Sequence, residues 1–165
     1  MKLGDGVEAA VHCAAMMVGL EGTAVLPAQA LAEYHGLKPS YLVKHLQAMV
    51  GAGILASVPG PAGGYRLARP ADAVTLLDIV LAVEGAEPAF RCGEIRQRGP
   101  GALPAECFRQ ACGINRAMLK AERAYRAALA EVTLAEIVTG FLAESDQRSI
   151  ARGAAFVAAN RRGAA

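Results

Sequence analysis

The sequence predicts a mainly α-helical protein with a small β-hairpin: a winged helix-turn-helix domain followed by a long dimerisation helix. Three observations in the 165-residue chain lead to this fold class. Two amphipathic segments, 27–35 and 39–50, are joined by a short connection that contains glycine. A run of Gly and Pro at 59–64 separates two short apolar segments, as in a β-hairpin. Apolar residues then recur at alternating steps of four and three from Ile114 to Val132, which is a heptad pattern.

The chain divides into four parts. We expect the winged helix-turn-helix domain at 1–85, a cysteine-containing loop at 86–103, the long dimerisation helix with a short C-terminal helix at 104–145, and a mobile tail at 146–165. No window approaches the ~18 to 20 uninterrupted apolar residues that a membrane span requires, and a secretory signal fits the opening residues poorly. We therefore expect a soluble protein with a cytoplasmic location and no membrane partner.

The first two helices have recognisable start and stop signals. Asp5 can cap a first helix that ends at Gly19 and Gly22. Pro27 is a favoured first helical residue, and Gly36 stands where a left-handed helix end is expected. The second helix is therefore short and is followed by a sharp turn.

The third helix and the hairpin complete the winged helix-turn-helix pattern. The sequence Lys38-Pro39-Ser40 opens the third helix, which Gly51 and Gly53 end. Residues 54–58 and 65–68 have the pattern of two strands around a Gly- and Pro-rich turn.

Two capping boxes predict where later helices begin. Thr75 with Asp78, and Thr133 with Glu136, have the spacing at which the first side chain and the third helical residue cap each other's backbone. The second of these helices is short and amphipathic and ends near Ser145.

The long helix between them is expected to begin at about Pro104. Its apolar seam has six members: Ile114, Met118, Ala121, Tyr125, Ala128 and Val132. Because such a seam is buried against a second helix, it predicts a homodimer.

Positive charge is concentrated in the helix-turn-helix region. The net charge of the whole chain is only +2, yet the stretch between Glu33 and Asp72 contains no carboxylate. It contains four basic side chains: Lys38, Lys44, Arg66 and Arg69. A basic block of this kind suits phosphate contact, so we expect double-stranded DNA as a partner.

The residues expected to contact DNA lie on the third helix and on the hairpin. A helix in the major groove presents its first turns to base edges. On the helix we expect contacts from Lys38, Ser40, Tyr41, Lys44 and His45. On the hairpin we expect them from Gly63, Gly64, Tyr65 and Arg66, since glycine lets the backbone approach phosphates closely. In a plainer interpretation Tyr41 covers the core, His45 is a solvated helix residue and the glycines only form a turn.

The four cysteines, Cys13, Cys92, Cys107 and Cys112, indicate a metal or redox site, because clustered cysteines in a reducing compartment seldom form structural disulfides. An iron-sulfur cluster commonly has four ligands, most often thiolates. Glu8 and His12 are candidates for the remainder, since they lie four apart on one helix face that could meet the cysteine region of a partner.

Other interpretations of these residues stay open. Cys13 also suits a small buried apolar position, and a site of Glu, His and two Cys also matches structural zinc. The chain has no Cys-x-x-Cys motif and no evident set of nucleophile and base, which argues against a thiol enzyme.

Three runs of sequence, 39–47, 52–55 and 60–69, combine a helix that contains Ser-Tyr-Leu with a wing that contains Gly-Gly-Tyr. Together they closely resemble the bacterial family of iron-sulfur winged-helix transcription regulators that includes IscR, NsrR and RsrR. The resemblance covers roughly residues 1–142. It implies a homodimeric, cytoplasmic transcription regulator that often carries a cluster.

The opening of the chain and the loop 92–100 are most similar to the redox-sensing branch of that family typified by RsrR. This resemblance implies a 2Fe-2S cluster held by Glu8 and His12 of one subunit and by Cys107 and Cys112 of the other. The sequence departs from the pattern at Ala9, where that branch can carry a large aromatic side chain. It also departs in the loop, because fourteen residues separate Cys92 from Cys107 where close spacing is usual.

The sequence therefore predicts a dimeric DNA-binding transcription regulator, not an enzyme. Its DNA affinity is expected to depend on the redox state or occupancy of an iron-sulfur cluster that the two subunits share, on a pseudo-palindromic operator. The alternative on the same fold is a metal-free thiol switch, or a regulator that responds to a small molecule.

Overall fold

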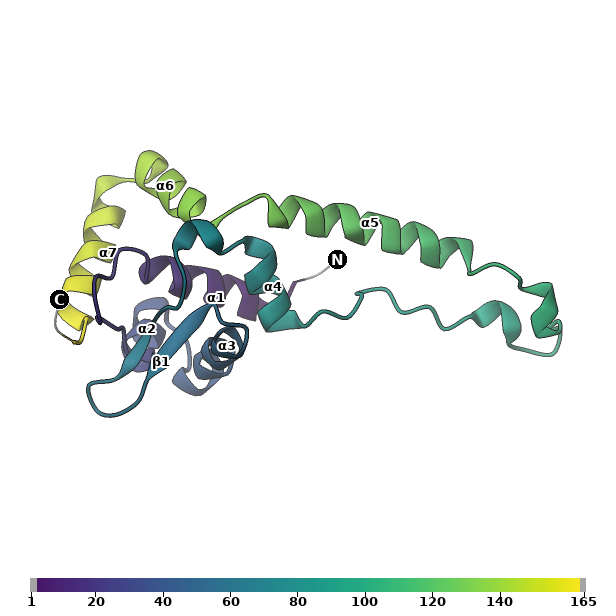
Figure 1. Cartoon of the computed structure of the whole chain (residues 1–165), viewed down its shortest axis with the longest axis horizontal. Helices are drawn as coiled ribbons and strands as arrows, with labels where there is room; N and C mark the ends of the chain where they lie inside the picture. Colours follow the sequence, from purple (N-terminus) through teal and green to yellow (C-terminus); the bar gives the residue numbers. More distant parts are fainter. Residues whose placement is uncertain (1–2, 164–165) are drawn as a thin grey trace.

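The structure, a computed structural model, describes residues 3–163. Figure 1 shows an arm that projects far from the rest of the molecule. We call residues 86–130 the arm; it consists of the loop 86–112 and helix α5, Gly113–Ala130, which returns along the loop. The remaining described residues form the head. In the described part of the chain, no helix has both the length and the apolar character that crossing a membrane requires.

Helix α1, Asp5–Met16, runs through the centre of the head. Its buried face consists mainly of small side chains: Gly6, Val7, Ala9, Ala10, Cys13 and Ala14. Small residues allow close approach, and α1 contacts α3, α4 and α6. Asp5, expected as the cap, is instead the first helical residue and follows an extended Gly4.

Helices α2, Ala28–His35, and α3, Pro39–Gly51, form the predicted helix-turn-helix. Gly36 ends α2 in the left-handed conformation, with φ of 65°, as the sequence predicts. Helix α3 buries Leu42, Leu46 and Met49 in the core, which leaves its other face to solvent.

The predicted wing is a two-stranded antiparallel hairpin of β1, Leu55–Val58, and β2, Gly64–Leu67. Its register pairs Leu55 with Leu67 and Val58 with Gly64. A backbone bridge between Leu26 and Tyr65 continues this pairing beyond β2, toward the segment that precedes α2.

Both predicted capping boxes are confirmed. Thr75 caps α4, Leu76–Glu84, and Thr133 caps α6, Leu134–Glu144. The backbones of Thr75 and Thr133 also form a bridge, so the two helix starts are held together.

The long helix begins later than the sequence suggests. Pro104 does not start a helix; it precedes a 3-10 turn at Ala105–Cys107, and α5 begins at Gly113. The intervening residues take part in contacts with Arg96, whose guanidinium lies 5.2 Å from the ring centroid of Phe108. Because of these contacts, and because the apolar seam begins only at Ile114, the helix starts at Gly113 and not at Pro104. Val132, expected in the seam, lies beyond the end of α5.

The expectation of a mobile tail at 146–165 is wrong for its described residues. They form α7, Gln147–Asn160, which Asp146 caps through the backbone N–H of Arg148. Phe156 and Val157 pack against the core. The half-buried positions 150, 153, 156, 157 and 160 recur at helical spacing, but their partner surface lies on α2, far away in the sequence. Residues 164–165 lie outside the described part.

Candidate functional site

The solvent face of α3 carries most of the side chains that the sequence analysis expected there. Ser40, Tyr41 and Lys44 are exposed within the first two turns of the helix, and Lys38, which precedes it, is exposed as well. The neighbouring wing lies beside α3, because Gln47 Nε2 donates a hydrogen bond of 2.9 Å to the hydroxyl of Tyr65 on β2. Helix and wing therefore lie side by side on the head.

His45 does not belong to this exposed set, which corrects the sequence-based expectation. Its side chain is buried and packs against α1, where a Cβ placed on Gly6 would lie 2.7 Å from Nε2 of His45. The ring lies edge-on to Tyr41, with 4.7 Å between centroids. Burial lowers the pKa of His45, Lys44 lowers it further, and Glu84 opposes the shift. The physical reason is that Gly6 opens a space on α1 which the imidazole fills.

The hairpin residues Gly63, Gly64 and Tyr65 also have structural roles. Tyr65 is buried and bonded to Gln47, so it does not face solvent. A Cβ on Gly64 would lie 2.5 Å from the carbonyl oxygen of Leu26, so the close backbone approach requires glycine. Gly63 is buried in the turn. The two glycines thus have the structural role that the plainer interpretation gives them, and DNA contact by Gly63, Gly64 and Tyr65 stays a prediction.

Arg66, which the sequence predicts to contact DNA, lies within β2 opposite Ala56. It is half-buried, its Nε is enclosed without a hydrogen-bond partner, and it lines a hollow of about 320 Å³ together with residues 17–20 and 69–71. In the same hollow Arg69 forms an ion pair of 3.0 Å with Asp78. Arg66 therefore lies beside the residues that follow α1, and Arg69 reaches the start of α4.

Arg162, which the sequence analysis did not single out, lies at the wing tip instead. Its Nη1 donates a hydrogen bond of 2.6 Å to the carbonyl oxygen of Pro61. Its backbone pairs with Val25 through two hydrogen bonds of 2.9 Å. The available signal was the wing turn itself, 59–64, which contains no charged side chain of its own.

The candidate metal ligands fall into two separate groups. Glu8 and His12 are exposed on α1 in the head. The ring of His12 lies 5.6 Å from that of His35 on α2. Cys112 precedes α5 at the outer end of the arm, remote from α1 (Figure 1). No group of three or more His, Cys, Asp or Glu that could hold a metal occurs among residues 3–163 of one chain.

The arm brings Cys112 together with Cys92, and this pairing was not expected. The pKa of the Cys112 thiol is lowered, chiefly by a hydrogen bond from the backbone N–H of Asn115, with a further one from Ile114. The Arg96 guanidinium and a hydrogen bond with Cys92 lower it further. The start of α5 and a nearby cation thus favour the thiolate.

Cys107 and Cys13 lie in different surroundings. Cys107 is exposed and lines an open hollow of about 510 Å³ with residues 96, 106 and 108–110. Cys13 is fully buried, and burial raises the pKa of its thiol to about 12. Cys13 is therefore a protonated core residue at neutral pH.

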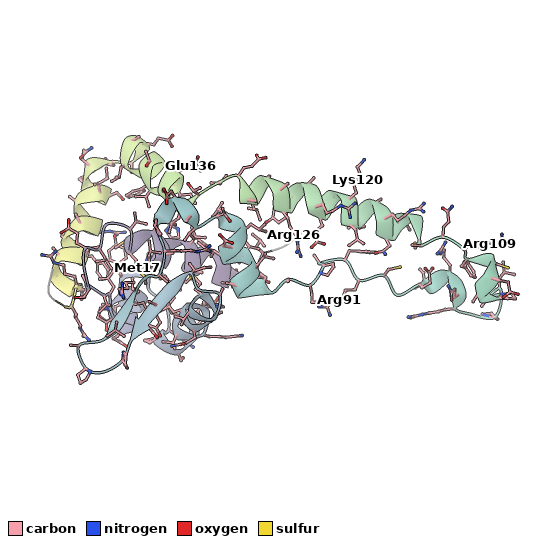
Figure 2. All side chains as sticks on the ribbon, in the orientation of Figure 1. Met17, Arg91, Arg109, Lys120, Arg126 and Glu136 are labelled. Atoms are coloured by element: carbon pink, nitrogen blue, oxygen red, sulfur yellow. The ribbon has the colours of Figure 1, made fainter. Side chains whose placement is uncertain are left out.

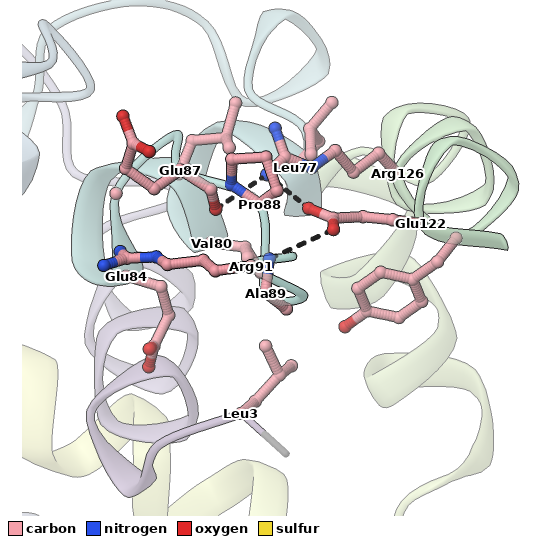
Figure 3. A pocket seen from close by; sticks show the side chains of 13 residues that line it. Leu3, Leu77, Val80, Glu84, Glu87, Pro88, Ala89, Arg91, Glu122 and Arg126 are labelled. Atoms are coloured by element: carbon pink, nitrogen blue, oxygen red, sulfur yellow. Dashed lines mark hydrogen bonds and ion pairs between the residues drawn. The ribbon is translucent and has the colours of Figure 1, made fainter. Parts of the chain in front are cut away.

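A buried carboxylate joins the two segments of the arm, the loop and α5. Glu122 on α5 is one of the two buried polar or charged side chains identified among the described residues. One of its oxygens accepts the backbone N–H of Ala89 at 3.0 Å, and the other lies 2.6 Å from Nη2 of Arg126. Arg126 in turn donates to the carbonyl oxygens of Ala86 and Glu87. Figure 3 shows Glu122 and Arg126 beside Glu87 and Ala89.

These bonds border a pocket of about 290 Å³ between α4, the loop and α5, where Arg126 and Arg91 lie (Figures 2 and 3). Because Ala89 is three residues from Cys92, the clamp fixes the inner end of the loop that carries one thiol of the pair. Because α5 packs against α4, and α4 packs against α3, a movement of the arm at this point would also move α4 relative to α3.

Comparison with known proteins identifies the family. A family model described as Rrf2, iron-dependent transcriptional regulator, matches residues 3–140. The Lactococcus lactis protein YffB, named among HTH-type transcriptional regulators, is 30% identical over 137 residues, which cover 83% of this chain and 86% of YffB. The regulator IscR of Vibrio campbellii is 34% identical over 67 residues, 41% of this chain and 40% of IscR.

Solved structures agree on the fold. The oxidised form of Staphylococcus aureus CymR superposes with a TM-score of 0.60 at 22% identity and covers 84% of this chain and 96% of its own. IscR of T. potens superposes with a TM-score of 0.62 at 21% identity and covers 92% and 96%. With its helix-turn-helix, wing and matching family model, the chain belongs to the Rrf2 family of transcription regulators, which are not enzymes.

Proposed function

We propose that this chain is a dimeric regulator that reads DNA with α3 and changes its DNA affinity according to the state of an iron-sulfur cluster held at the arm. The observation that carries the regulatory part is the contact between Cys92 and Cys112, in which Cys112 is held toward its thiolate form. Support for iron comes from the family, which is described as iron-dependent.

The DNA-reading part rests on the exposed face of α3. Ser40, Tyr41 and Lys44 occupy the first turns of a helix whose opposite face is core, so they are the side chains that a major groove would meet. Lys38 precedes the helix and suits a phosphate. Two such helices related by a two-fold axis read half-sites about one helical turn apart, ~34 to 36 Å.

The dimer rests on the apolar face of α5. Regulators of this family bind DNA and are typically dimeric. Here Ile114 is 66% exposed and Met118 is 45% exposed, on a helix whose one buried residue among those described is Glu122. Burial of an apolar helix face is what stabilises most helices, so this seam requires a partner. A second copy of α5 supplies the matching heptad pattern.

The donor set suits a 2Fe-2S cluster. Cys92 and Cys112 of one arm are the two thiol ligands in this proposal, in place of the pair Cys107 and Cys112, because Cys92 is the thiol that contacts Cys112. Glu8 and His12 of a second copy complete the set, since both are exposed on α1. The cluster, when bound, supplies one-electron redox chemistry.

The chain's own residues connect that site to the DNA surface. Backbone N–H groups at the start of α5 and the Arg96 guanidinium lower the pKa of Cys112, which favours the thiolate that binds metal. Glu122 and Arg126 hold the loop against α5, and α5 packs on α4. Helix α1, which carries Glu8 and His12, packs directly on α3. When the cluster changes state, its ligands on α1 and on the arm shift, and α3 is expected to shift with them.

A second candidate is a metal-free thiol switch, and the contact between Cys92 and Cys112 favours it too. In that case the two thiols form a disulfide and give up two electrons and two protons to an oxidant, such as a small disulfide that is reduced to two thiols.

Anaerobic purification separates the two candidates. Visible absorbance together with iron and sulfide in a one-to-one ratio supports the cluster. A colourless protein without iron, in which mass spectrometry finds a Cys92–Cys112 disulfide after oxidation, supports the thiol switch. Zinc in the same assay without sulfide contradicts both.

A further inference from the structure

The wing of this protein lacks a cation of its own at its tip. The turn 59–64 reads Pro-Gly-Pro-Ala-Gly-Gly, and the flanking strands contribute one arginine, Arg66, which is half-buried in the hollow beside α1. A winged helix uses its wing to contact the phosphate backbone next to the groove that the reading helix enters. On this wing, no side chain of the turn could pair with a phosphate.

The C-terminal segment places a cation, Arg162, at the wing tip. Its guanidinium donates to the carbonyl oxygen of Pro61 at 2.6 Å, in the middle of the turn. One of its five N–H donors is used in this bond, so others remain for an anion. The residue is exposed, as is its neighbour Arg161. Arg162 thus stands beside the glycine-rich turn, and a second exposed arginine precedes it in the chain.

The position of Arg162 is fixed by backbone pairing. The N–H and carbonyl groups of Arg162 and Val25 exchange two hydrogen bonds of 2.9 Å. The next residue, Leu26, exchanges two more of 2.9 Å with Tyr65 of β2. The C-terminal segment therefore lies at the edge of the same hydrogen-bonded ladder as the wing, and Arg162 cannot move away from it without breaking those bonds.

Helix α7 positions the C-terminal segment beside the wing. The ring of Phe156 lies 4.4 Å from that of Tyr34 on α2, and Arg152 Nε donates to the Tyr34 hydroxyl at 3.3 Å. In Figure 1 α7 descends along the side of the head and ends next to the hairpin. The match to the family model ends at residue 140, so this helix and the arginines that follow lie outside what the family model describes.

We propose that Arg162, with Arg161 beside it, supplies the wing's contact to the phosphate backbone of DNA, and that α7 is the support that places it. The inference rests on the proposed DNA binding and extends the DNA surface to a segment outside the family match. Pro61 orients the guanidinium and the glycines of the turn let the phosphate approach.

The test uses the full-length dimer and measures affinity for operator and for unrelated duplex DNA between about 50 and 200 mM salt. Arg162→Ala is expected to weaken binding to both duplexes by a similar factor and to lower the salt slope by about one unit, because one phosphate contact is lost. Arg161→Ala with Arg162→Ala is expected to lower it further. Arg148→Ala is the matched control, because Arg148 lies at the other end of α7 in an exposed ion pair with Asp146.

The outcomes are separable. Arg162→Gln keeps an amide donor for the Pro61 carbonyl, so it should show the same loss of slope even if Arg162→Ala also loosens the wing. An unchanged slope in both Arg162 variants overturns the inference, as does an equal loss in Arg148→Ala. If the parent protein binds no DNA, the proposed function itself fails. If the parent binds DNA and the Arg162 variants bind equally well, only the inference about Arg162 fails.

Discussion

Glu122 Oε1 lies 2.6 Å from Nη2 of Arg126, one turn further along α5, while its Oε2 accepts the N–H of Ala89 from the facing loop. Through these contacts Glu122 connects α5 to the loop that runs beside it, which are the two segments of the arm. The carboxylate is buried, so removing it leaves the Ala89 N–H without its acceptor and leaves the Arg126 guanidinium with only the carbonyl oxygens of Ala86 and Glu87.

The first prediction follows from that clamp. Glu122→Ala should lower the free energy of unfolding by about 1–3 kcal/mol, the usual cost of leaving buried polar groups unsatisfied. Glu122→Gln should cost less, because its amide oxygen still accepts the Ala89 N–H. Trypsin should cut the loop at Arg91, Arg96 and Arg98 faster in both variants. Arg123→Ala, an exposed neighbour on α5, is the control; an equal effect there would show that the clamp carries no special stabilisation.

The local elements of the head could be predicted from sequence because their signals are local. Thr75 with Asp78 and Thr133 with Glu136 cap their own helices, and Gly36 ends α2 through its own φ. The side chains whose positions the sequence did not predict depend instead on segments that are distant along the chain. His45 is buried because Gly6 leaves space on α1, and Arg66 turns inward toward residues 17–20.

The same distinction explains the arm and the C-terminus. The contact of Cys92 with Cys112 depends on the path of the nineteen residues between them, where Arg96 bonds to Gln110, and no spacing rule predicts that path. Helix α7 has helical periodicity of its own, but its aromatic partner, Tyr34, stands 122 positions before Phe156. A tail that looks unpartnered in sequence thus becomes part of the head.

A second prediction concerns pH. Because burial lowers the pKa of His45 in the folded state, the unfolded chain takes up a proton first as the pH falls. The stabilisation is complete above the ordinary value of 6.5 and is lost as the pH falls from 6.5 toward the lower folded pKa. His35, whose pKa is also lowered by burial, contributes in the same direction.

Replacing His45 isolates its share of this dependence. His45→Gln removes the titrating group, so its thermal midpoint should fall less steeply between pH 7 and pH 5 than that of the parent, although its stability at pH 7 is lower. Calorimetry at each pH measures this. Parallel curves for parent and variant would mean that His45 contributes nothing to the pH dependence.

A third prediction concerns the dimer. Burying Met118 is worth about 1.5 kcal/mol per side chain, and two-fold symmetry doubles this to about 3 kcal/mol, or roughly 150-fold in the dissociation constant. Met118→Glu should exceed that loss because it also places a charge in an apolar seam. Sedimentation should then show monomers, and DNA affinity should fall. Arg123→Glu changes the charge on an exposed α5 side chain outside the seam; if it dissociates the dimer as well, the seam is not the interface.

A fourth prediction distinguishes the two possible thiol pairs. If Cys92 and Cys112 are the thiol ligands, Cys92→Ser and Cys112→Ser should each abolish iron binding, whereas Cys107→Ser and Cys13→Ser should keep it. Cys13 serves as the internal control, because its thiol is fully buried with a pKa raised to about 12. Loss of iron in Cys107→Ser with retention in Cys92→Ser would restore the pair that the sequence suggested.

The last prediction tests whether each site is shared between subunits. One chain cannot bring Glu8 and His12 to the outer end of the arm, so each site should combine the helix pair of one subunit with the thiols of the other. A homodimer of Glu8→Ala, His12→Ala chains should hold no cluster, and neither should one of Cys92→Ser, Cys112→Ser chains. A heterodimer of the two, purified through a different tag on each chain, contains one intact site, formed by the thiols of the first chain and the helix pair of the second. Its other site lacks all four ligands. After anaerobic reconstitution the heterodimer should therefore contain about half the iron and sulfide of the parent dimer, as two-fold symmetry requires. If each site instead lay within one chain, both sites of the heterodimer would be incomplete, and iron at background level would refute the shared arrangement.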